Sequence, residues 1–229
     1  LLRQLLKQQV NFEYVPVDIS ASALEQLKES LQQELPDLAV QPVSGEYFEA
    51  LQWLQENKPE PKVLLFLGSN IGNFEKADSI AFLQRIRQFL NKNDKLLLGC
   101  DLRKDPRKIR AAYDDSAKVT AEFNYNLLRR INRELQANFE VDQFEHFAEY
   151  DPVEGVMKSF LISKKAQTVT IGATGKTYSF NAWEAIHTEN SYKYSLNQIE
   201  EMAGLSQFRI EASFTDKAAN FTDVVLKTT

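Results

Sequence analysis

Hydrophobic positions in the first half of the chain follow two periods in turn, which predicts strands alternating with helices. FEYVPV at 12–17 has the alternation and β-branched content of a strand, and LAVQPV at 38–43 predicts another. Ser22 with Glu25 three residues later has the form of a capping box that opens a helix between them. The apolar positions of that helix recur every three or four residues, at Leu24, Leu27, Leu31 and Leu35.

The next segments continue the same alternation. KVLLFL at 62–67 is almost continuously apolar, as buried parallel strands are, and KLLLGCD at 95–101 predicts a further strand. The helix between them has one apolar face, formed by Phe82, Leu83, Ile86, Phe89 and Leu90. Repeated strand and helix segments favour a parallel sheet covered by helices.

The C-terminal segment has a different pattern. A helix around 196–202 is followed by FRIEASF at 208–214 and FTDVVLKT at 221–228, with six residues between the two strands. A loop this short excludes a parallel crossover, so the last strand is predicted to run antiparallel. A parallel sheet closed by an antiparallel strand is the α/β, Rossmann-like arrangement of class I methyltransferases.

Between these parts the strand and helix alternation lapses. Residues 106–135 are predicted to be largely helical, while MKSFLIS, TVTI and KTYSF predict short strands of an antiparallel sheet. We therefore predict a Rossmann-like domain formed by 1–104 and 195–229, with a smaller α+β substrate domain inserted at 105–194.

Composition limits the classes of function. The 229 residues carry 32 Asp and Glu against 27 Lys and Arg, which disfavours a nucleic-acid partner. No apolar run approaches the ~20 residues of a membrane span. The single cysteine, Cys100, favours a reducing cytoplasm, and His146 and His187 lie too far apart in the sequence to suggest a metal site.

The stretch FLGSNIGNF at 66–74 ends a predicted buried strand in small and amide residues. It lacks the GxxxxGK spacing of a phosphate loop, because Gly68 and Gly72 are four apart and Asn73 follows. Gly68 is a candidate for backbone contact with a cofactor. The Asn73 amide donates and accepts hydrogen bonds, which suits an amino acid substrate, although an ordinary turn also explains it.

Two other strand ends carry candidate binding groups. Asp18 follows the first strand, where a carboxylate can accept both hydroxyl groups of a ribose. A cap for the next helix is the alternative role for Asp18. Glu46 and Tyr47 follow the second strand, where a carboxyl group and a ring can hold a purine.

Polar groups in the predicted insertion form two further clusters. Tyr113 precedes a long helix, and Asp115 is expected to stabilise the N-terminus of that helix. In IHTENSYKYS at 186–195, alternation directs Glu189 and Ser191 to the same side of an extended segment. A carboxylate beside a hydroxyl group suits an imidazole, and a polar edge strand is the alternative.

These blocks together resemble a known family, the histidine-specific, S-adenosylmethionine-dependent methyltransferases that trimethylate the α-amine of L-histidine on the way to ergothioneine. The resemblance covers nearly the whole chain and is carried by PVDIS, GEYFEAL, FLGSNIGNF, GCDLRKD, AAYDDSAKVTAEFNYNLLRRINREL and HTENSYKYS.

The resemblance implies a role for each candidate residue. Asp18 would bind the ribose of S-adenosylmethionine, and Glu46 with Tyr47 would hold its adenine. Asn73 and Tyr113 would fix the amino and carboxylate groups of the amino acid, and these two form the expected catalytic pair. Glu189 and Ser191 would bind the imidazole ring. No metal is required for this reaction.

Two departures from the family pattern matter. Members of the family begin with a strand and a glycine-rich loop that bind the methionine part of the cofactor. This sequence starts at the helix that follows that loop. Without the strand and the loop, we expect weak cofactor binding. Ser159 stands where the family commonly has a methionine lining the substrate pocket. The alternatives are therefore the same reaction on another amino acid or small amine, or a non-catalytic adenosine-binding module.

Overall fold

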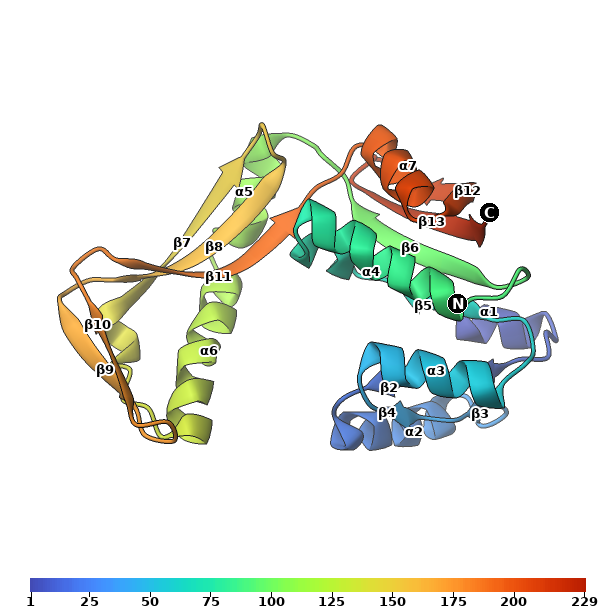
Figure 1. Ribbon diagram of the computed structural model, residues 1–229, viewed down its shortest axis with the longest axis horizontal. Coiled ribbons are helices and arrows are strands. Elements are labelled where there is room, and N and C mark those ends of the chain that lie inside the picture. Colours follow the sequence, from blue (N-terminus) through green and yellow to red (C-terminus); the bar gives the residue numbers. More distant parts are fainter. The chain divides into compact units, whose positions relative to one another are not determined.

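A computed structural model describes residues 1–229, which divide into two compact units (Figure 1). The first unit consists of Leu1–Lys62 and Arg85–Asn91, and the second of Val63–Gln84 and Lys92–Thr229. The predicted domain boundaries at 104/105 and 194/195 remain a prediction, since the division into units falls elsewhere.

The first unit contains short parallel strand pairs and three of the helices. Strand β1 pairs with β3, and β2 pairs with β4, both in parallel. Pro16 and Pro42 lie between the paired segments and interrupt each strand, because proline has no N–H for the ladder. The elements are α1 (Leu2–Lys7), β1 (Glu13–Tyr14), β2 (Val17–Asp18), α2 (Ala21–Glu34), β3 (Ala39–Val40), β4 (Val43–Ser44) and α3 (Tyr47–Asn57).

The start of α2 differs from the prediction. Ser20, and not Ser22, is the N-cap residue, and its side chain accepts from the backbone N–H of Ala23. The predicted capping box of Ser22 with Glu25 is wrong, because α2 begins two residues earlier, at Ala21.

A four-stranded sheet forms the core of the second unit, in the order β12, β13, β6, β5. Strands β5 and β6 are parallel, while β13 runs antiparallel to β6 and lies between β6 and β12. This confirms the predicted α/β arrangement with an antiparallel last strand. The elements are β5 (Val63–Phe66), η1 (Asn70–Asn73), α4 (Lys76–Phe89), β6 (Lys95–Asp101), α7 (Leu196–Leu205), β12 (Phe208–Thr215) and β13 (Phe221–Thr228). The part of α4 from Arg85 onward belongs to the first unit.

Strand β5 is less buried than its apolar sequence predicts. Val63 is 62% exposed, and Leu64 and Leu65 are half-buried. The reason is that β5 is an edge strand of this sheet and pairs only with β6. Phe66, at its carboxyl end, is buried against Phe82 of α4 with ring centroids 5.0 Å apart.

Residues 105–194 form an antiparallel part of the second unit. Strands β7, β8 and β11 form one sheet, and helix α6 runs along it (Figure 1). The sequence analysis missed β7, since FEHFAEYD contains as many charged or polar residues as apolar ones. The elements are α5 (Pro106–Tyr113), α6 (Val119–Leu135), η2 (Val141–Gln143), β7 (Phe144–Asp151), β8 (Val156–Ser163), β9 (Gln167–Ile171), β10 (Lys176–Phe180) and β11 (Ala185–Tyr192).

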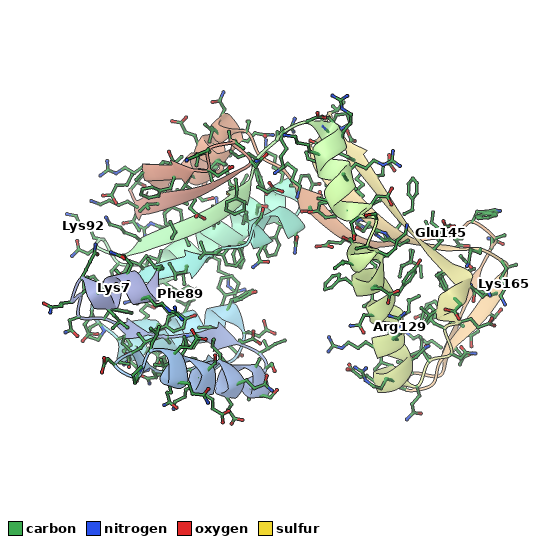
Figure 2. All side chains as sticks on the ribbon, turned by 180° about the vertical axis from the view of Figure 1, so that it is seen from behind. Lys7, Phe89, Lys92, Arg129, Glu145 and Lys165 are labelled. Atoms are coloured by element: carbon green, nitrogen blue, oxygen red, sulfur yellow. The ribbon has the colours of Figure 1, made fainter.

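One face of this sheet is covered and the other is exposed. Leu161 of β8 is fully buried in a cluster with Leu128 of α6 and Phe144 of β7. Glu145, the next residue of β7, lies on the opposite, exposed face, and its side chain is labelled in Figure 2. None of the helices is long and apolar enough to span a membrane.

We expect Leu161→Ala to lower the free energy of unfolding by about 2–5 kcal/mol, because it leaves a cavity between β8 and α6. The matched control is Leu127→Ala on α6, whose side chain is 42% exposed; its expected cost is below about 1 kcal/mol. Urea unfolding measures both values. Equal losses would contradict the assignment of this face as the core.

Candidate active site

The predicted adenosine-binding residues lie at the carboxyl ends of two neighbouring parallel strands in the first unit. Asp18 ends β2, and its partner in register on β4 is Ser44. Glu46 follows β4 as the N-cap of α3, and Tyr47 is the first residue of that helix. The side chains of Asp18, Glu46 and Tyr47 are exposed, as a ligand site at this edge requires.

Asp18 and Glu46 also take part in local hydrogen bonds. The Asp18 Oδ1 atom accepts from the backbone N–H of Ser20 at 2.8 Å. Asp18 therefore stands before the cap of α2 and is not the cap itself. Glu46 and Glu49 form a capping box at the start of α3. Each carboxylate keeps further lone pairs for a ligand hydroxyl or amine group.

In the second unit, the chain after β5 turns sharply through two left-handed residues, Gly68 (φ +74°) and Ser69 (φ 59°). The Ser69 Oγ atom accepts from the backbone N–H of Asp101 at 3.0 Å, which ties this loop to the end of β6. The 3-10 helix η1 follows and ends at Asn73. Gly68 and Asn73 are thus positioned beside the carboxyl ends of parallel strands, where α/β sheets bind ligands.

A cleft of about 380 Å³ opens at this edge. Its lining contains five of the residues singled out from the sequence, since Gly68 and Asn73 meet Tyr113, Glu189 and Ser191 there. The remaining lining residues are Ser69, Asn70, Asp101, Lys104, Lys193 and Phe221. Segments more than 120 residues apart in the sequence therefore form one site, of a size that suits a small polar molecule.

Ser159 does not line the cleft, although its partner in register, Glu189, does. It pairs with Glu189 across β8 and β11, and opposed residues of antiparallel strands point to the same side of a sheet. Its side chain is only 1% exposed. A role for Ser159 in substrate binding remains a prediction.

The centre of the cleft wall is a buried lysine, Lys193, which is 2% exposed. Its Nζ atom donates to the hydroxyl oxygens of Tyr113 at 2.8 Å and Ser191 at 2.7 Å. It also lies 3.0 Å from Asp101 Oδ2, while Lys104 pairs with Asp101 Oδ1. Because an unpaired ammonium group is costly to bury, the carboxylate of Asp101 is what allows Lys193 to occupy this position.

Glu189 faces the same cleft and is half-buried. Burial raises the pKa of its carboxyl group, and the nearby charge of Lys193 lowers it, with burial the larger effect. A carboxylate with few competing partners at the wall of a cleft is suited to accept a hydrogen bond from a ligand N–H group.

A β-bulge between His187 and Glu189 sets the direction of the Glu189 side chain. The pairing of β11 with β8 shifts by one residue there, so Thr188 is the extra residue. The Thr188 hydroxyl group lies 2.6 Å from Asn124 Oδ1 of helix α6 and 2.9 Å from the backbone oxygen of Ser159. These contacts hold the bulge, and alternation then brings Glu189 and Ser191 to the cleft side, as predicted.

Strand β11 is held against the start of α4 by Glu75. Its Oε1 atom accepts from the Asn190 amide at 2.9 Å, and its Oε2 atom accepts from the Tyr192 hydroxyl group at 2.6 Å. Burial and the bond to Glu75 raise the pKa of Tyr192 to about 12. The two residues that flank Ser191 therefore fix the strand from its other side.

The loop carrying Asn73 approaches β11 very closely at Gly72. A Cβ atom at this position would lie 2.8 Å from the backbone oxygen of Tyr192 and 3.3 Å from its nitrogen. Only glycine allows this approach, which brings Asn73 close to the strand that carries Glu189 and Ser191.

Sequence reasoning missed Lys193, Asp101 and Lys104. Lys193 continues the alternation of Glu189 and Ser191, so the spacing of residues 189, 191 and 193 was the signal that could have identified it. Asp101 ends β6 and Lys104 follows shortly after it, where ligand-binding residues of such sheets gather. The expected role of Asp115 is confirmed, since its carboxylate accepts from the backbone N–H groups of Val119 and Thr120 at the start of α6.

The sheet is of the α/β type and is closed by an antiparallel strand, and a small polar cleft lies at the carboxyl ends of its parallel strands. This arrangement is that of the class I methyltransferases. Comparison with known proteins is more specific, because the profile of the histidine-specific, SAM-dependent methyltransferases matches residues 1–228. The chain belongs to this family.

Individual relatives agree with this assignment. The chain is 36% identical over 209 residues to the histidine N-alpha-methyltransferase of Mycobacterium tuberculosis and 34% identical over 208 residues to that of Mycolicibacterium smegmatis. Each alignment covers 91% of this chain and 64% of the relative, so the chain spans a little under two thirds of their length. An L-tryptophan methyltransferase of Psilocybe serbica is 27% identical, with 92% of this chain and 62% of that protein covered.

Gly72→Ala should destabilise the protein by about 1–3 kcal/mol, because the added methyl group overlaps the Tyr192 backbone. Gly204→Ala on α7 is the matched control, since its Cβ atom meets nothing within 4 Å. That control should be neutral or slightly stabilising, by up to about 1 kcal/mol. Thermal unfolding compares the two; a neutral Gly72→Ala would contradict the close approach of η1 and β11.

Glu189 should make stability fall as pH rises. Its folded-state pKa lies above the ordinary value of 4.5, so the folded protein binds more protons than the unfolded chain between these two values. Ionised Glu189 therefore costs stability at neutral pH, and Glu189→Gln should melt at a higher temperature near pH 7. The gain should disappear near pH 4, where both states are protonated. A melting-temperature gain that does not change with pH would contradict this.

Proposed function

We propose that the protein transfers methyl groups from S-adenosylmethionine to the α-amine of L-histidine, giving Nα-trimethylhistidine, the step that the resemblance links to ergothioneine. The observation that carries the proposal is the single cleft that gathers Asn73, Tyr113, Glu189 and Ser191 in a member of this family. The acidic composition supports a small-molecule substrate over a nucleic acid.

The α-amino and carboxylate groups of the substrate are assigned to Asn73 and Tyr113. The Asn73 side chain is exposed at the cleft, and an amide can accept from an amine and donate to a carboxylate. The Tyr113 hydroxyl group donates to Ser191 and accepts from Lys193, which leaves one lone pair on its oxygen to accept from the substrate α-amine.

The side chain of the substrate is assigned to Glu189 and Ser191. A neutral imidazole has one N–H group and one bare ring nitrogen, so it complements an acceptor beside a donor. Glu189 supplies the acceptor as a carboxylate, and Ser191 supplies a hydroxyl group. Both line the cleft, and each is carried by the same strand.

The methyl donor is assigned to Asp18, Glu46, Tyr47 and Gly68, as the family resemblance implies. Asp18 would bind the ribose hydroxyl groups, Glu46 with Tyr47 would bind the adenine, and the Gly68 backbone would contact the cofactor. The fit rests on chemistry, since exposed carboxylates at adjacent parallel strand ends are the usual acceptors for ribose hydroxyl groups. When bound, this molecule supplies a methyl group on a positively charged sulfur.

The residues of this chain would act mainly by positioning. Asn73 and Tyr113 hold the α-amine in line for attack, and orientation alone can supply several kcal/mol, up to about 10, of the barrier reduction. The amine reacts only when neutral, and partial desolvation in the cleft favours that form. Its proton would leave through water or through the Tyr113 oxygen.

The domain assignment follows the same division of roles. Tyr113, Glu189 and Ser191 come from residues 105–194, which we propose as the substrate domain. Asp18, Glu46 and Gly68 come from residues 1–104, which together with 195–229 form the proposed methyltransferase domain.

The same reaction on another amino acid is the second candidate. The small Ser159 side chain faces the same side of the sheet as Glu189, where a larger residue would fill the space behind it. The Psilocybe serbica relative is named for L-tryptophan, so different members carry names for different amino acids.

The full-length protein, incubated with S-adenosylmethionine and each amino acid in turn, should yield mono-, di- and trimethylated histidine by mass spectrometry. Glu189→Ala should lower kcat/KM for histidine by about 100-fold or more, because the ring N–H loses its acceptor. The matched control is Glu145→Ala, which removes a carboxylate from the exposed face of β7 (Figure 2) and should retain activity. Methylation of another amino acid alone would support the second candidate, and no product with any amino acid would refute both.

A further inference from the structure

Three protein oxygens surround the Lys193 ammonium group. It donates to Tyr113 Oη at 2.8 Å and Ser191 Oγ at 2.7 Å, and it forms an ion pair with Asp101 Oδ2 at 3.0 Å. An ammonium group has three donors and no acceptor, so its hydrogen bonds admit a single direction. The side chain is 2% exposed, and its charge is balanced inside the protein by Asp101.

The backbone of Lys193 is held as firmly as its side chain. Its N–H donates to the backbone oxygen of Gly155 at 2.7 Å, and its own backbone oxygen accepts from Arg103 Nε at 3.3 Å. Arg103 also donates to the backbone oxygen of Glu154 at 2.6 Å. The turn between β7 and β8 and the chain after β6 therefore fix the position of the ammonium group.

Lys193 determines which of the neighbouring hydroxyl groups donate a hydrogen bond and which accept one. The Tyr113 hydroxyl group donates its hydrogen to Ser191 Oγ at 2.8 Å. Ser191 Oγ then accepts from both Lys193 and Tyr113, which fills its two lone pairs. The Ser191 hydrogen is left over, and the only side of Ser191 open to a ligand is the cleft.

Lys193 also influences the acceptor beside Ser191. Its positive charge lowers the pKa of Glu189, against the larger opposing effect of burial. The same ammonium group thus favours a hydrogen-bond donor at Ser191 and an ionised acceptor at Glu189.

We propose that Lys193 is a positioning residue that fixes Ser191 as a hydrogen-bond donor, so that the cleft selects a side chain with a bare acceptor nitrogen beside an N–H group. The inference rests on the proposed function, since it concerns how the same cleft recognises the side chain of its substrate. Lys193 itself does not touch the substrate.

The selection follows from donor and acceptor matching. A neutral imidazole pairs with both Ser191 and Glu189, whereas an imidazolium brings a second N–H group to an oxygen with no free lone pair. An indole has an N–H group but no acceptor nitrogen, so it leaves the Ser191 hydrogen unpaired. An unpaired buried donor weakens binding by about ten- to a hundredfold.

Lys193→Met tests the inference, because methionine keeps a long apolar stem while Asp101 keeps Lys104 as its ion-pair partner. Titration calorimetry with L-histidine, in the presence of S-adenosylhomocysteine, should give a Kd about tenfold or more weaker near pH 8. In the unmodified protein Kd should rise steeply as pH falls through about 6.5, where the imidazole becomes charged. In Lys193→Met this rise should flatten, since Ser191 regains a lone pair and can accept.

Lys104→Met is the matched control. It removes a neighbouring cation from the same carboxylate but touches neither Ser191 nor Tyr113. This variant should keep the steep pH dependence and the preference for histidine over tryptophan, even where it changes the absolute affinity. Flattening in both variants would overturn the inference, because a general charge effect would then explain it.

A second measurement needs no variant and covers the case in which Lys193→Met does not fold. The two pyrrolylalanine isomers keep the ring size and one N–H group but replace the acceptor nitrogen with carbon. Both should bind the unmodified protein about tenfold or more weakly than L-histidine. Equal binding by either isomer would overturn the donor assignment at Ser191.

The outcomes separate this inference from the proposed function. Methylation of histidine with an unaltered Kd and pH profile in Lys193→Met would overturn the role of Lys193 alone. Absence of histidine binding in the unmodified protein would overturn both.

Discussion

The buried ion pair of Lys193 with Asp101 is the interaction on which the cleft depends. It joins the carboxyl end of β6 to the segment after β11, and through Tyr113 it includes the end of α5. A charge at 2% exposure is tolerated only with a partner, and Asp101 in turn is balanced by Lys104. Removing Asp101 would leave the buried ammonium group without its carboxylate, whereas Asp101 keeps Lys104 when Lys193 is removed. The positions of Tyr113 and Ser191 are therefore coupled to the sheet by electrostatics as well as by packing.

Strand β11 is the element that this arrangement positions. Lys193 fixes its carboxyl end, Glu75 holds Asn190 and Tyr192, and Gly72 lets η1 approach its backbone. The bulge at Thr188 then directs Glu189 to the cleft. Under the proposed function Glu189 meets the ring of the substrate, and support on every side would keep its carboxylate in place. Several polar residues near the cleft provide this support by bonding to other protein groups.

Local sequence patterns predicted much of the fold. The apolar runs identified β6 and the helical face of α4, and the short loop before β13 implied its antiparallel direction. The failures also have local causes. The alternation in β7 was obscured by its glutamates, and β5 was expected to be buried although it has a single neighbour in its sheet. Burial depends on which elements cover a strand, and that information is not contained in the strand itself.

The sequence by itself determined which residue types follow each strand and, through its long motif blocks, the family. It also indicated that Glu189 and Ser191 share one side, because alternation is a property of the extended backbone. Only the tertiary structure decided that Lys193 is buried, that Asp101 neutralises it and that Ser159 is buried outside the cleft lining. These relations join residues up to 92 positions apart, as Asp101 and Lys193 are. The physical reason is that the ionisation, hydrogen-bond direction and accessibility of a side chain are set by its neighbours in space, which periodicity along the chain does not specify.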